Sequence, residues 1–294
     1  MPASDNSEQS NAKRKKLRRV EIKTRKLSAQ VFSGSYHSAF KGRGISFSEV
    51  REYQYGDDIR NIDWNVTARF NHPYIKIFDE ERELTVMLLI DLSDSKEFGS
   101  QKLLKRELIT ELSAVLSFSA IQNNDKIGVI FFSDKIEKYI PPKKGKKHIL
   151  RIIRELIDLR PESKGTNIAE ALRYLTNVQK KKTITFLISD FIDTGYADAL
   201  RIANHKHDVI AVHVYDTRES ELPNVGLVKM RDAESDKFMW IDTSDSSIRK
   251  KYHETWIKAD LKLKDIFTRA AVDNVKIKTD EDYVKPLRLL FKQR

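Results

Sequence analysis

Hydrophobic residues follow two alternating patterns from residue 83 onward. Short, nearly continuous apolar runs are typical of buried parallel strands, whereas apolar residues spaced three and four apart are typical of amphipathic helices. Residues 102–123, for example, place Leu104, Leu108 and Leu112 on one helical stripe. Because strands and helices alternate, the pattern predicts an α/β fold, a mostly parallel Rossmann-like sheet with helices on both faces.

The predicted elements follow one another with short connections. Strands are expected at residues 84–90, 126–133, 183–189, 208–215 and 275–278, with residues 136–140 as a hairpin partner closed by Pro141 and Pro142. Helices are expected at residues 102–123, 146–159, 168–180, 197–205 and 247–271, and again after residue 278. Residues 227–242 interrupt this alternation and predict an inserted hairpin.

The first 82 residues lack this alternation. Residues 1–19 are polar and then dense in Lys and Arg, and they are predicted to form a disordered basic tail. Residues 20–82 mix charged and aromatic side chains with tight Gly turns and a strand at residues 74–78, which predicts a small N-terminal β-containing subdomain. The α/β domain is therefore expected to span residues 83–294.

Composition excludes several classes of protein. No apolar run in the 294 residues approaches the ~18 that a membrane-spanning helix needs. The N-terminus has no apolar core of a secretory signal, so a cytoplasmic location is expected. The absence of Cys excludes disulfides, thiolate catalysis and cysteine-ligated zinc.

The net charge of +11 is concentrated at the two ends of the chain. Residues 1–30 carry nine Lys and Arg against three Asp and Glu, and residues 249–294 carry thirteen against seven. The residues between them are nearly neutral, which disfavours a continuous nucleic-acid groove. Peripheral contact with an anionic membrane, or weak nucleic-acid binding, through the basic ends stays open as an alternative.

A candidate site begins where the first predicted strand ends. Asp91, Ser93 and Ser95 form an Asp-x-Ser-x-Ser sequence directly after the apolar run. Ligand crevices of open α/β sheets lie at the carboxyl ends of such strands, and a carboxylate with two hydroxyls suits Mg²⁺. The alternative is structural, because Asp and Ser also cap turns and helices.

Two distant segments add to this site. The strand at residues 183–189 also runs into a carboxylate, Asp190. Asn167 with Glu170 three residues later predicts a helix N-cap with a capping-box-like partner. This cap leaves the Thr166 hydroxyl outside the helix, where it can turn toward a ligand or serve only as a turn residue.

In this order, Asp91, Ser93, Ser95, Thr166 and Asp190 resemble the metal-ion-dependent adhesion site of von Willebrand factor A domains. The resemblance implies Mg²⁺, or Mn²⁺, bound directly by the three hydroxyls, while both carboxylates act largely through water. One coordination position would stay open for an acidic side chain of a partner. Many members of that family have Gly-Ser-Met where this chain has Asp94-Ser95-Lys96, which alters the charge beside the site.

A second segment narrows the resemblance. Residues 47–64, with Gly56-Asp57-Asp58 and then Asp63-Trp64, resemble the hallmark of the bacterial domain of unknown function fifty-eight. That family is von Willebrand factor A-like and is usually found beside MoxR-type AAA+ ATPases. The resemblance implies a non-enzymatic adaptor that works with a MoxR-type AAA+ ATPase on a client protein.

The charges of this hallmark favour a structural role. Arg51, Arg60 and Arg69 face an excess of carboxylates in the sequence, and they predict an ion-pair network that fixes the subdomain to the sheet. Catalysis is the rival class, as a metal-dependent hydrolase or phosphatase. A haloacid-dehalogenase-type phosphatase would need Asp where Ser93 stands, and the sequence contains no P-loop, nucleophile elbow or zinc-protease helix.

Overall fold

The computed structural model describes residues 18–24, 27–28, 46–79, 83–93, 105–163, 165–231 and 238–294. Clustering of contacts divides the chain into two compact units. Residues 40–84 form the smaller unit, and the residues on either side of it together form the larger one. Within the described ranges, no helix is both long and apolar enough to cross a membrane.

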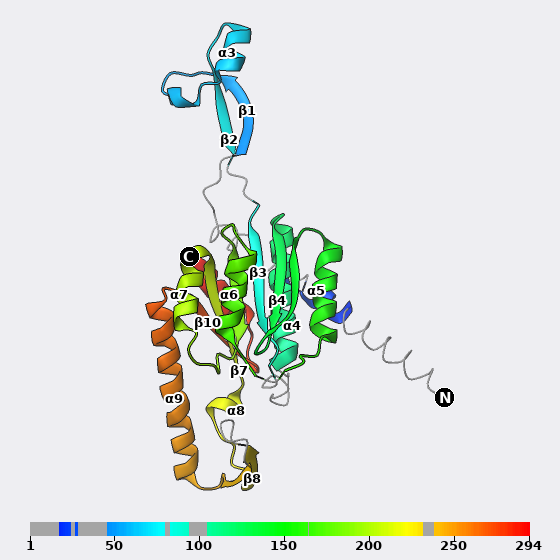
Figure 1. Cartoon of the computed structure of the whole chain (residues 1–294), viewed down its shortest axis with the longest axis vertical. Helices are drawn as coiled ribbons and strands as arrows, with labels where there is room; N and C mark the ends of the chain where they lie inside the picture. Colours follow the sequence, from blue (N-terminus) through cyan, green and yellow to red (C-terminus); the bar gives the residue numbers. More distant parts are fainter. Residues whose placement is uncertain are drawn as a thin grey trace, which may run out of the picture. The chain divides into compact units, whose positions relative to one another are not determined.

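Six strands form the sheet of the larger unit, in the order β10-β7-β6-β3-β4-β5 (Figure 1). All neighbours pair in parallel except β4 and β5, which form an antiparallel hairpin at one edge. The strands are β3 (Thr85–Asp91), β4 (Lys126–Phe132), β5 (Ile136–Lys143), β6 (Ile184–Ser189), β7 (Asp208–Tyr215) and β10 (Asp273–Lys278). The predicted fold class, a mostly parallel α/β sheet, is confirmed.

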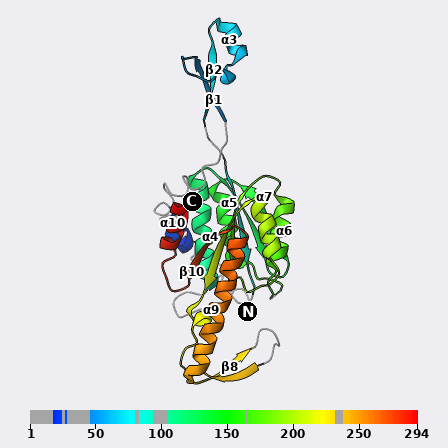
Figure 2. The same cartoon turned by 90° about the vertical axis from the view of Figure 1, so that its left-hand side faces the viewer.

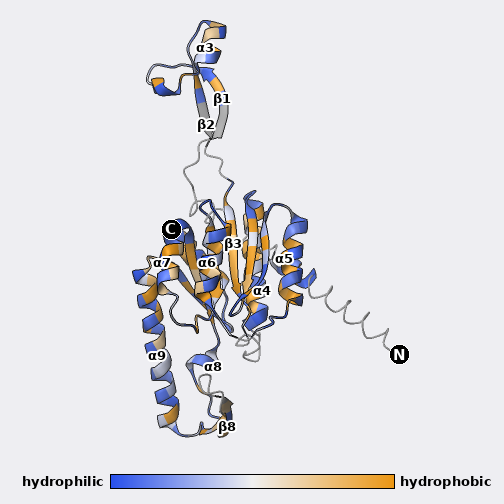
Figure 3. Cartoon of the chain, viewed as in Figure 1, coloured by the Kyte–Doolittle hydropathy of each residue, from blue (hydrophilic) through white to orange (hydrophobic). Residues whose placement is uncertain are grey.

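Helices cover both faces of this sheet. One face packs against α6 (Ile168–Val178), α7 (Ala197–Lys206) and the C-terminal part of α9 (Ser246–Arg269). The other face carries α4 (Lys105–Gln122), α5 (Lys146–Asp158) and α10 (Val284–Gln293), as Figure 2 shows for α4 and α10. Because both faces are covered, the central strands are mostly apolar (Figure 3).

The predicted end of the hairpin at Pro141 and Pro142 is wrong. Strand β5 continues through both prolines to Lys143. Proline lacks an N–H donor, but β5 is an edge strand and needs donors on only one side. The backbone comes so close here that a Cβ on Gly128 of β4 would lie 2.9 Å from Ile140 O and Pro142 N. Glycine is therefore the residue that fits this position.

The inserted hairpin is present as β8 (Leu227–Arg231) and β9 (Phe238–Asp242). It leaves large apolar side chains exposed, among them Phe238, Met239 and Trp240. The short helix α8 (Thr217–Ser220) precedes the hairpin and is tied to α9, because Tyr252 Oη donates to Arg218 O and the His253 ring bonds Ser220 O.

The smaller unit consists of β1 (Ser46–Glu52), a 3-10 turn (Ile59–Asn61), α3 (Trp64–Phe70) and β2 (Tyr74–Asp79), with β1 and β2 antiparallel. Arg51 makes a bidentate ion pair with Asp57 at 2.8 Å, and Arg60 pairs with Asp58. Asp63 caps α3 by accepting from the N–H groups of Asn65 and Val66. These pairs lie within the unit, so the described part of the predicted network stabilises the subdomain itself.

A short helix lies near the predicted boundary at residue 20. Residues 18–24 are helical and belong to the larger unit, where Val20 and Thr24 are buried. Lys23 Nζ pairs with Glu111 of α4 at 2.7 Å, which ties this helix to the α/β domain. The smaller compact unit spans residues 40–84, within and just beyond the predicted subdomain of residues 20–82. Of the predicted tail, residues 1–17 lie outside the described residues.

Candidate metal centre

The site begins at the carboxyl end of β3. Asp91 is fully buried, and its Oδ1 accepts from the Ser93 N–H at 2.9 Å, which closes a tight turn. The Leu92 N–H donates to Phe132 O at 2.8 Å, so this turn starts beside the end of β4. An uninterrupted apolar strand thus delivers one carboxylate and one hydroxyl residue to the edge of the sheet.

Strand β6 brings a second carboxylate to the same edge. Ser189 Oγ donates to Asp91 Oδ2 at 2.6 Å, which links the ends of the two neighbouring strands. Asp190 follows directly and is buried. Phe191 then has φ +58°, a left-handed conformation that costs a bulky residue about 1–3 kcal/mol. Its ring contacts Tyr196 and Phe267, and this packing holds the sharp turn after Asp190.

The loop before α6 carries Thr166 to this end of the sheet. The Asn167 N–H donates to Ser133 O at 2.8 Å, directly after β4. The predicted N-cap is confirmed, because Asn167 Oδ1 accepts from the Glu170 N–H at 2.9 Å. The reciprocal capping-box bond from Glu170 is replaced by the bond to Ser133. Thr166 is half-buried beside this anchored residue.

Four of the five predicted ligands therefore come to one edge of the sheet. Asp91, Ser93 and Asp190 lie at the ends of adjacent strands, and Thr166 is held beside the end of the next strand. Ser95 lies outside the described residues. The donor set of two carboxylates and two hydroxyls consists of hard oxygen atoms, which fits Mg²⁺ or Mn²⁺.

Both carboxylates already bind protein donors. Each oxygen of Asp91 accepts a hydrogen bond, and Asp190 Oδ1 accepts from the Ile192 N–H at 3.3 Å. Carboxylates held in this way suit contact with a cation through water, which Mg²⁺ retains readily. Among the residues that the structure describes, no group of three or more His, Cys, Asp or Glu could hold a metal ion. A cation at this candidate site would need hydroxyl ligands as well as the two carboxylates.

A buried lysine is the feature that the sequence analysis missed. Lys105, at the start of α4, is 1% exposed, and its Nζ lies 3.2 Å from Asp190 Oδ2. The same ammonium group contacts Glu219 Oε1 of α8. The predicted helical stripe contained a signal for it, because Lys105 precedes Leu108 and Leu112 at helical spacing. A lysine on a core-facing stripe requires a buried carboxylate partner.

Burial and charge act in opposite directions on this cluster. Burial disfavours the ammonium group, but the attraction of Asp190 and Glu219 outweighs it, so the pKa of Lys105 is raised. Burial raises the pKa of Glu219, and the attraction of Lys105 offsets only part of this effect. Lys105 is therefore charged at neutral pH and neutralises part of the negative charge beside the candidate site.

Strand β7 adds one more carboxylate to this edge. Asp216 is fully buried directly after β7, and its Oδ2 accepts from Thr279 Oγ1 at 2.6 Å. Its Oδ1 accepts from the Arg218 N–H and caps α8. In the sequence, Asp216 with Glu219 three residues later is typical of a capping box. The structure directs Glu219 to Lys105, and a local motif gives no sign of that contact.

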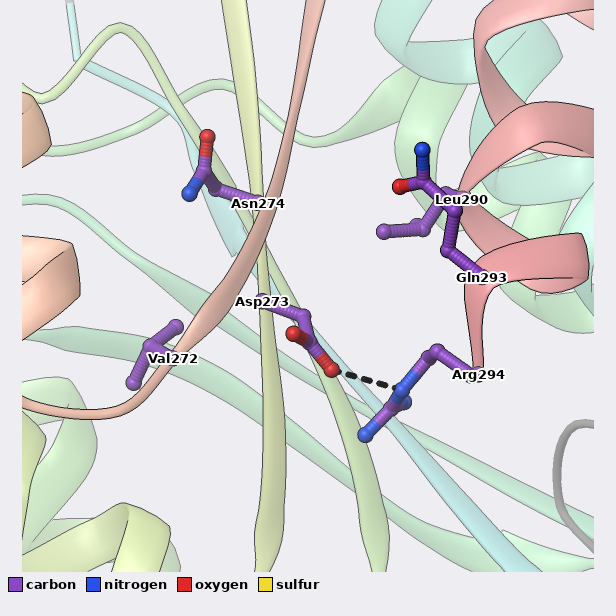
Figure 4. Close-up of a pocket in the computed structure, with 6 residues that line it drawn as sticks. All are labelled: Val272, Asp273, Asn274, Leu290, Gln293 and Arg294. Atoms are coloured by element: carbon purple, nitrogen blue, oxygen red, sulfur yellow. Dashed lines mark ion pairs between the residues drawn. The ribbon is translucent and has the colours of Figure 1, made fainter.

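A pocket of about 470 Å³ lies at the amino ends of the strands, between the start of β10 and α10 (Figure 4). Arg294 Nε pairs there with Asp273 at 2.7 Å, and its guanidinium also pairs with Asp208 at the start of β7. These groups are at the amino ends of the strands, so the pocket is separate from the candidate metal centre.

Comparison with protein families gives one match over most of the chain. A family model described as "Protein of unknown function DUF58" matches residues 49–260. The uncharacterized protein Rv1480 of Mycobacterium tuberculosis is 31% identical over 222 residues, which cover 74% of this chain and 70% of that protein. The uncharacterized protein Mb1516 of Mycobacterium bovis shows the same identity and coverage.

Solved structures resemble the chain more distantly. The conserved hypothetical protein BatB from Bacteroides thetaiotaomicron has a TM-score of 0.48 at 15% identity and covers 71% of this chain and 98% of its own. An aerotolerance-related membrane protein from Bacteroides fragilis has a TM-score of 0.47 at 15% identity, covering 72% of this chain and 100% of its own. Proximal thread matrix protein 1 from the mussel byssus, with a zinc-occupied MIDAS motif, has a TM-score of 0.37 at 18% identity, covering 46% and 38%.

Proposed function

We propose a function for this chain on the premise that it belongs to DUF58, a family of unknown function, and has a von Willebrand factor A-like fold. The chain is a non-enzymatic adaptor that binds other proteins through a Mg²⁺-dependent site at the carboxyl edge of its sheet. Its partners are a MoxR-type AAA+ ATPase and a client protein that offers an acidic side chain. This role places the adaptor in the cytoplasm.

One observation carries the metal-dependent part of the proposal. Asp91, Ser93 and Asp190 are distant in sequence or separated by a tight turn, yet they meet at the ends of two adjacent strands. Ser93 and Thr166 would supply hydroxyl oxygens to Mg²⁺, together with Ser95, and the two carboxylates would act through water. When bound, the cation supplies an open coordination position that a carboxylate of the client can fill.

Two features of the site support protein binding in preference to catalysis. Ser93 N–H and Ser189 Oγ each donate to one oxygen of Asp91, so both oxygens of this carboxylate already serve as acceptors within the protein. Lys105 is held between two carboxylates and is charged, which removes it as a nucleophile or base. The described site therefore supports binding better than acid–base chemistry.

The partner assignment rests on the resemblance of residues 47–64 to the family's hallmark. This segment forms the smaller unit's strand, turn and helix start, with charges paired inside the unit. Trp64, Ile59 and Tyr55 remain exposed on it. A small unit with fixed turns and exposed apolar side chains is suited to contact with another protein.

The test is capture of proteins by the immobilised chain. We expect the wild-type chain to retain a AAA+ ATPase and a client in Mg²⁺ or Mn²⁺, and to lose the client with a chelator. Ser93→Ala should lose the client in Mg²⁺ as well. Asp198→Ala, which removes an exposed carboxylate of α7, is the matched control and should capture normally.

Client capture that persists with chelator and in Ser93→Ala would contradict metal-dependent binding. A chain that instead retains polyanions, with an affinity that falls steeply as salt rises, would favour the alternative of contact through its basic ends. Turnover of a phosphate ester that requires the metal and Asp91 would favour a hydrolase.

A further inference from the structure

Lys105 lies where it can regulate the candidate metal centre. Its ammonium group is 3.2 Å from Asp190 Oδ2, and this carboxylate is one of the proposed metal-binding groups. Both side chains are 1% exposed, so water screens their interaction very little. The family's ligand pattern contains no lysine, and the ion pair is a feature of this chain's own structure.

We infer that Lys105 is a built-in counter-ion that competes with a divalent cation for Asp190. A cation at the site and the ammonium group of Lys105 are like charges that share one carboxylate. Each therefore weakens the binding of the other. The chain therefore binds Mg²⁺ weakly because of the Lys105 charge. This inference rests on the proposed function and adds to it how the affinity for the cation is controlled.

Glu219 makes this competition reversible. It contacts the same Nζ from α8, so Lys105 keeps one carboxylate partner when Asp190 turns toward a cation. Without Glu219, the ammonium group would be left buried and unpaired, which is strongly unfavourable. Glu219 is therefore a positioning residue that makes Asp190 available to the metal.

The contact between Lys105 and Glu219 connects the candidate site with α8 and α9. Glu219 lies in α8, whose carbonyl groups at Arg218 and Ser220 accept hydrogen bonds from Tyr252 and His253 of α9. If Lys105 moved away from Asp190 and paired with Glu219 only, the position of α8 would be affected, and α8 precedes the β8–β9 hairpin.

The experiment measures Mn²⁺ and Mg²⁺ binding to the purified full chain by calorimetry. Lys105→Gln keeps two N–H donors for the carboxylates but removes the charge, and we expect it to bind the cation about tenfold or more tightly than the wild type. Glu219→Gln should bind it more weakly than the wild type. Lys138→Met is the matched control, because it removes one lysine charge from an ion pair with Glu155 of α5, at 2.7 Å, and should bind as the wild type does.

Circular dichroism and thermal unfolding show whether each variant is folded. If Lys105→Gln does not fold, the double variant Lys105→Met with Glu219→Gln replaces it, because it removes one buried charge of each sign. Tighter binding after loss of the Lys105 charge supports the inference. If the variant binds the cation but the wild type binds it too weakly to measure, the inference stands and the metal dependence of the proposed function fails.

Two results would overturn the inference. Equal or weaker binding by the folded Lys105 variant, with clear binding by the wild type, would refute competition and leave the metal-dependent function intact. No binding by the wild type or by any folded variant would refute both.

Discussion

Asp91 offers a way to separate the structural role of the site from its role in metal binding. The side chain is fully buried and joins two segments, because it accepts from the Ser93 N–H at 2.9 Å and from Ser189 Oγ at 2.6 Å. Asp91→Asn keeps the shape and removes the charge. Asp91→Leu keeps the approximate volume and removes both acceptors.

The two substitutions should differ in stability. In Asp91→Asn, the amide oxygen can still accept from Ser93, and the amide group can donate to Ser189, whose hydroxyl is also an acceptor. We expect a loss of at most about 1 kcal/mol in the free energy of unfolding. Asp91→Leu leaves two buried donors without these partners, at about 1–3 kcal/mol each, so a loss of about 2–6 kcal/mol is expected.

The effect of Asp91→Asn on metal binding should be much larger than its effect on stability. A cation at about 100 times its Kd adds about 2.7 kcal/mol to the stability of a protein that binds it only when folded. We expect the wild type to gain this stabilisation in urea unfolding with Mg²⁺. Asp91→Asn should gain almost none, although it folds, because it lacks one of the two carboxylate charges.

Unfolding curves with and without Mg²⁺ for the two variants, the wild type and the control Asp198→Asn check this reasoning. Asp198 is an exposed carboxylate in α7, and its variant should respond to Mg²⁺ as the wild type does. If Asp91→Asn gains as much stability from Mg²⁺ as the wild type, Asp91 is a structural residue only. If Asp91→Leu is as stable as Asp91→Asn, the hydrogen bonds drawn here do not hold the turn.

Three further predictions test other parts of the molecule. Thr166→Val removes a hydroxyl from a half-buried residue, and it should change the free energy of unfolding by less than about 1 kcal/mol. It should nevertheless abolish Mg²⁺-dependent client capture, and full capture would exclude Thr166 as a ligand. Burial lowers the pKa of His207 to about 4, so the unfolded chain binds more protons below its usual pKa, and stability should fall between about pH 6.5 and pH 4 by up to about 3 kcal/mol from this residue. His207→Asn should show a smaller fall in chemical unfolding over that range, and an equal fall would assign the pH dependence to other groups. Val20→Ala should lower the free energy of unfolding by about 1–2 kcal/mol, because Val20 is buried in the α/β domain; an unchanged value would mean that the N-terminal helix does not pack there.

The order of strands and helices in the α/β domain could be predicted because each element carries its own periodic signal. Strand β3 is buried over six consecutive residues, and its continuous apolar run allowed only a central strand. The ends of β3 and β6 followed from the same runs, since an apolar strand stops where a carboxylate begins. Asp91 and Asp190 could therefore be placed at one edge of the sheet before any contact was known.

A helical or mixed segment could be predicted to start near residue 20, but not which of its positions are buried, because two of the three buried positions are polar. Val20, Thr24 and Ser28 lie four residues apart and are all buried. Thr24 can be buried because its hydroxyl donates to Val20 O at 2.6 Å within the same helix. A hydropathy pattern counts both hydroxyl residues as polar, so it could not identify the buried side of this segment.

The contacts among the residues of the candidate site could not be predicted in the same way, because they join elements that are far apart in the chain. Lys105 and Asp190 are separated by 85 residues, and Ser189 and Asp91 by 98. Each of these residues also has a common local role, as a solvated lysine, a strand-end serine or a helix cap. Which role a residue takes depends on the element that packs against it. The spacing of Lys105 indicates that it needs a buried carboxylate partner, but no local pattern identifies Asp190 or Glu219 as that partner.

A family resemblance transfers a ligand pattern more safely than it transfers an affinity. Asp91, Ser93, Thr166 and Asp190 can keep their positions while a single lysine changes the free energy of the bound cation. Lys105 would have this effect while every motif residue is unchanged, because it contacts Asp190 from α4 and is not one of the five motif positions. Relatives that share the motif but carry an apolar residue at this position should therefore bind Mg²⁺ more tightly than this chain, and the difference should vanish when Lys105 is replaced.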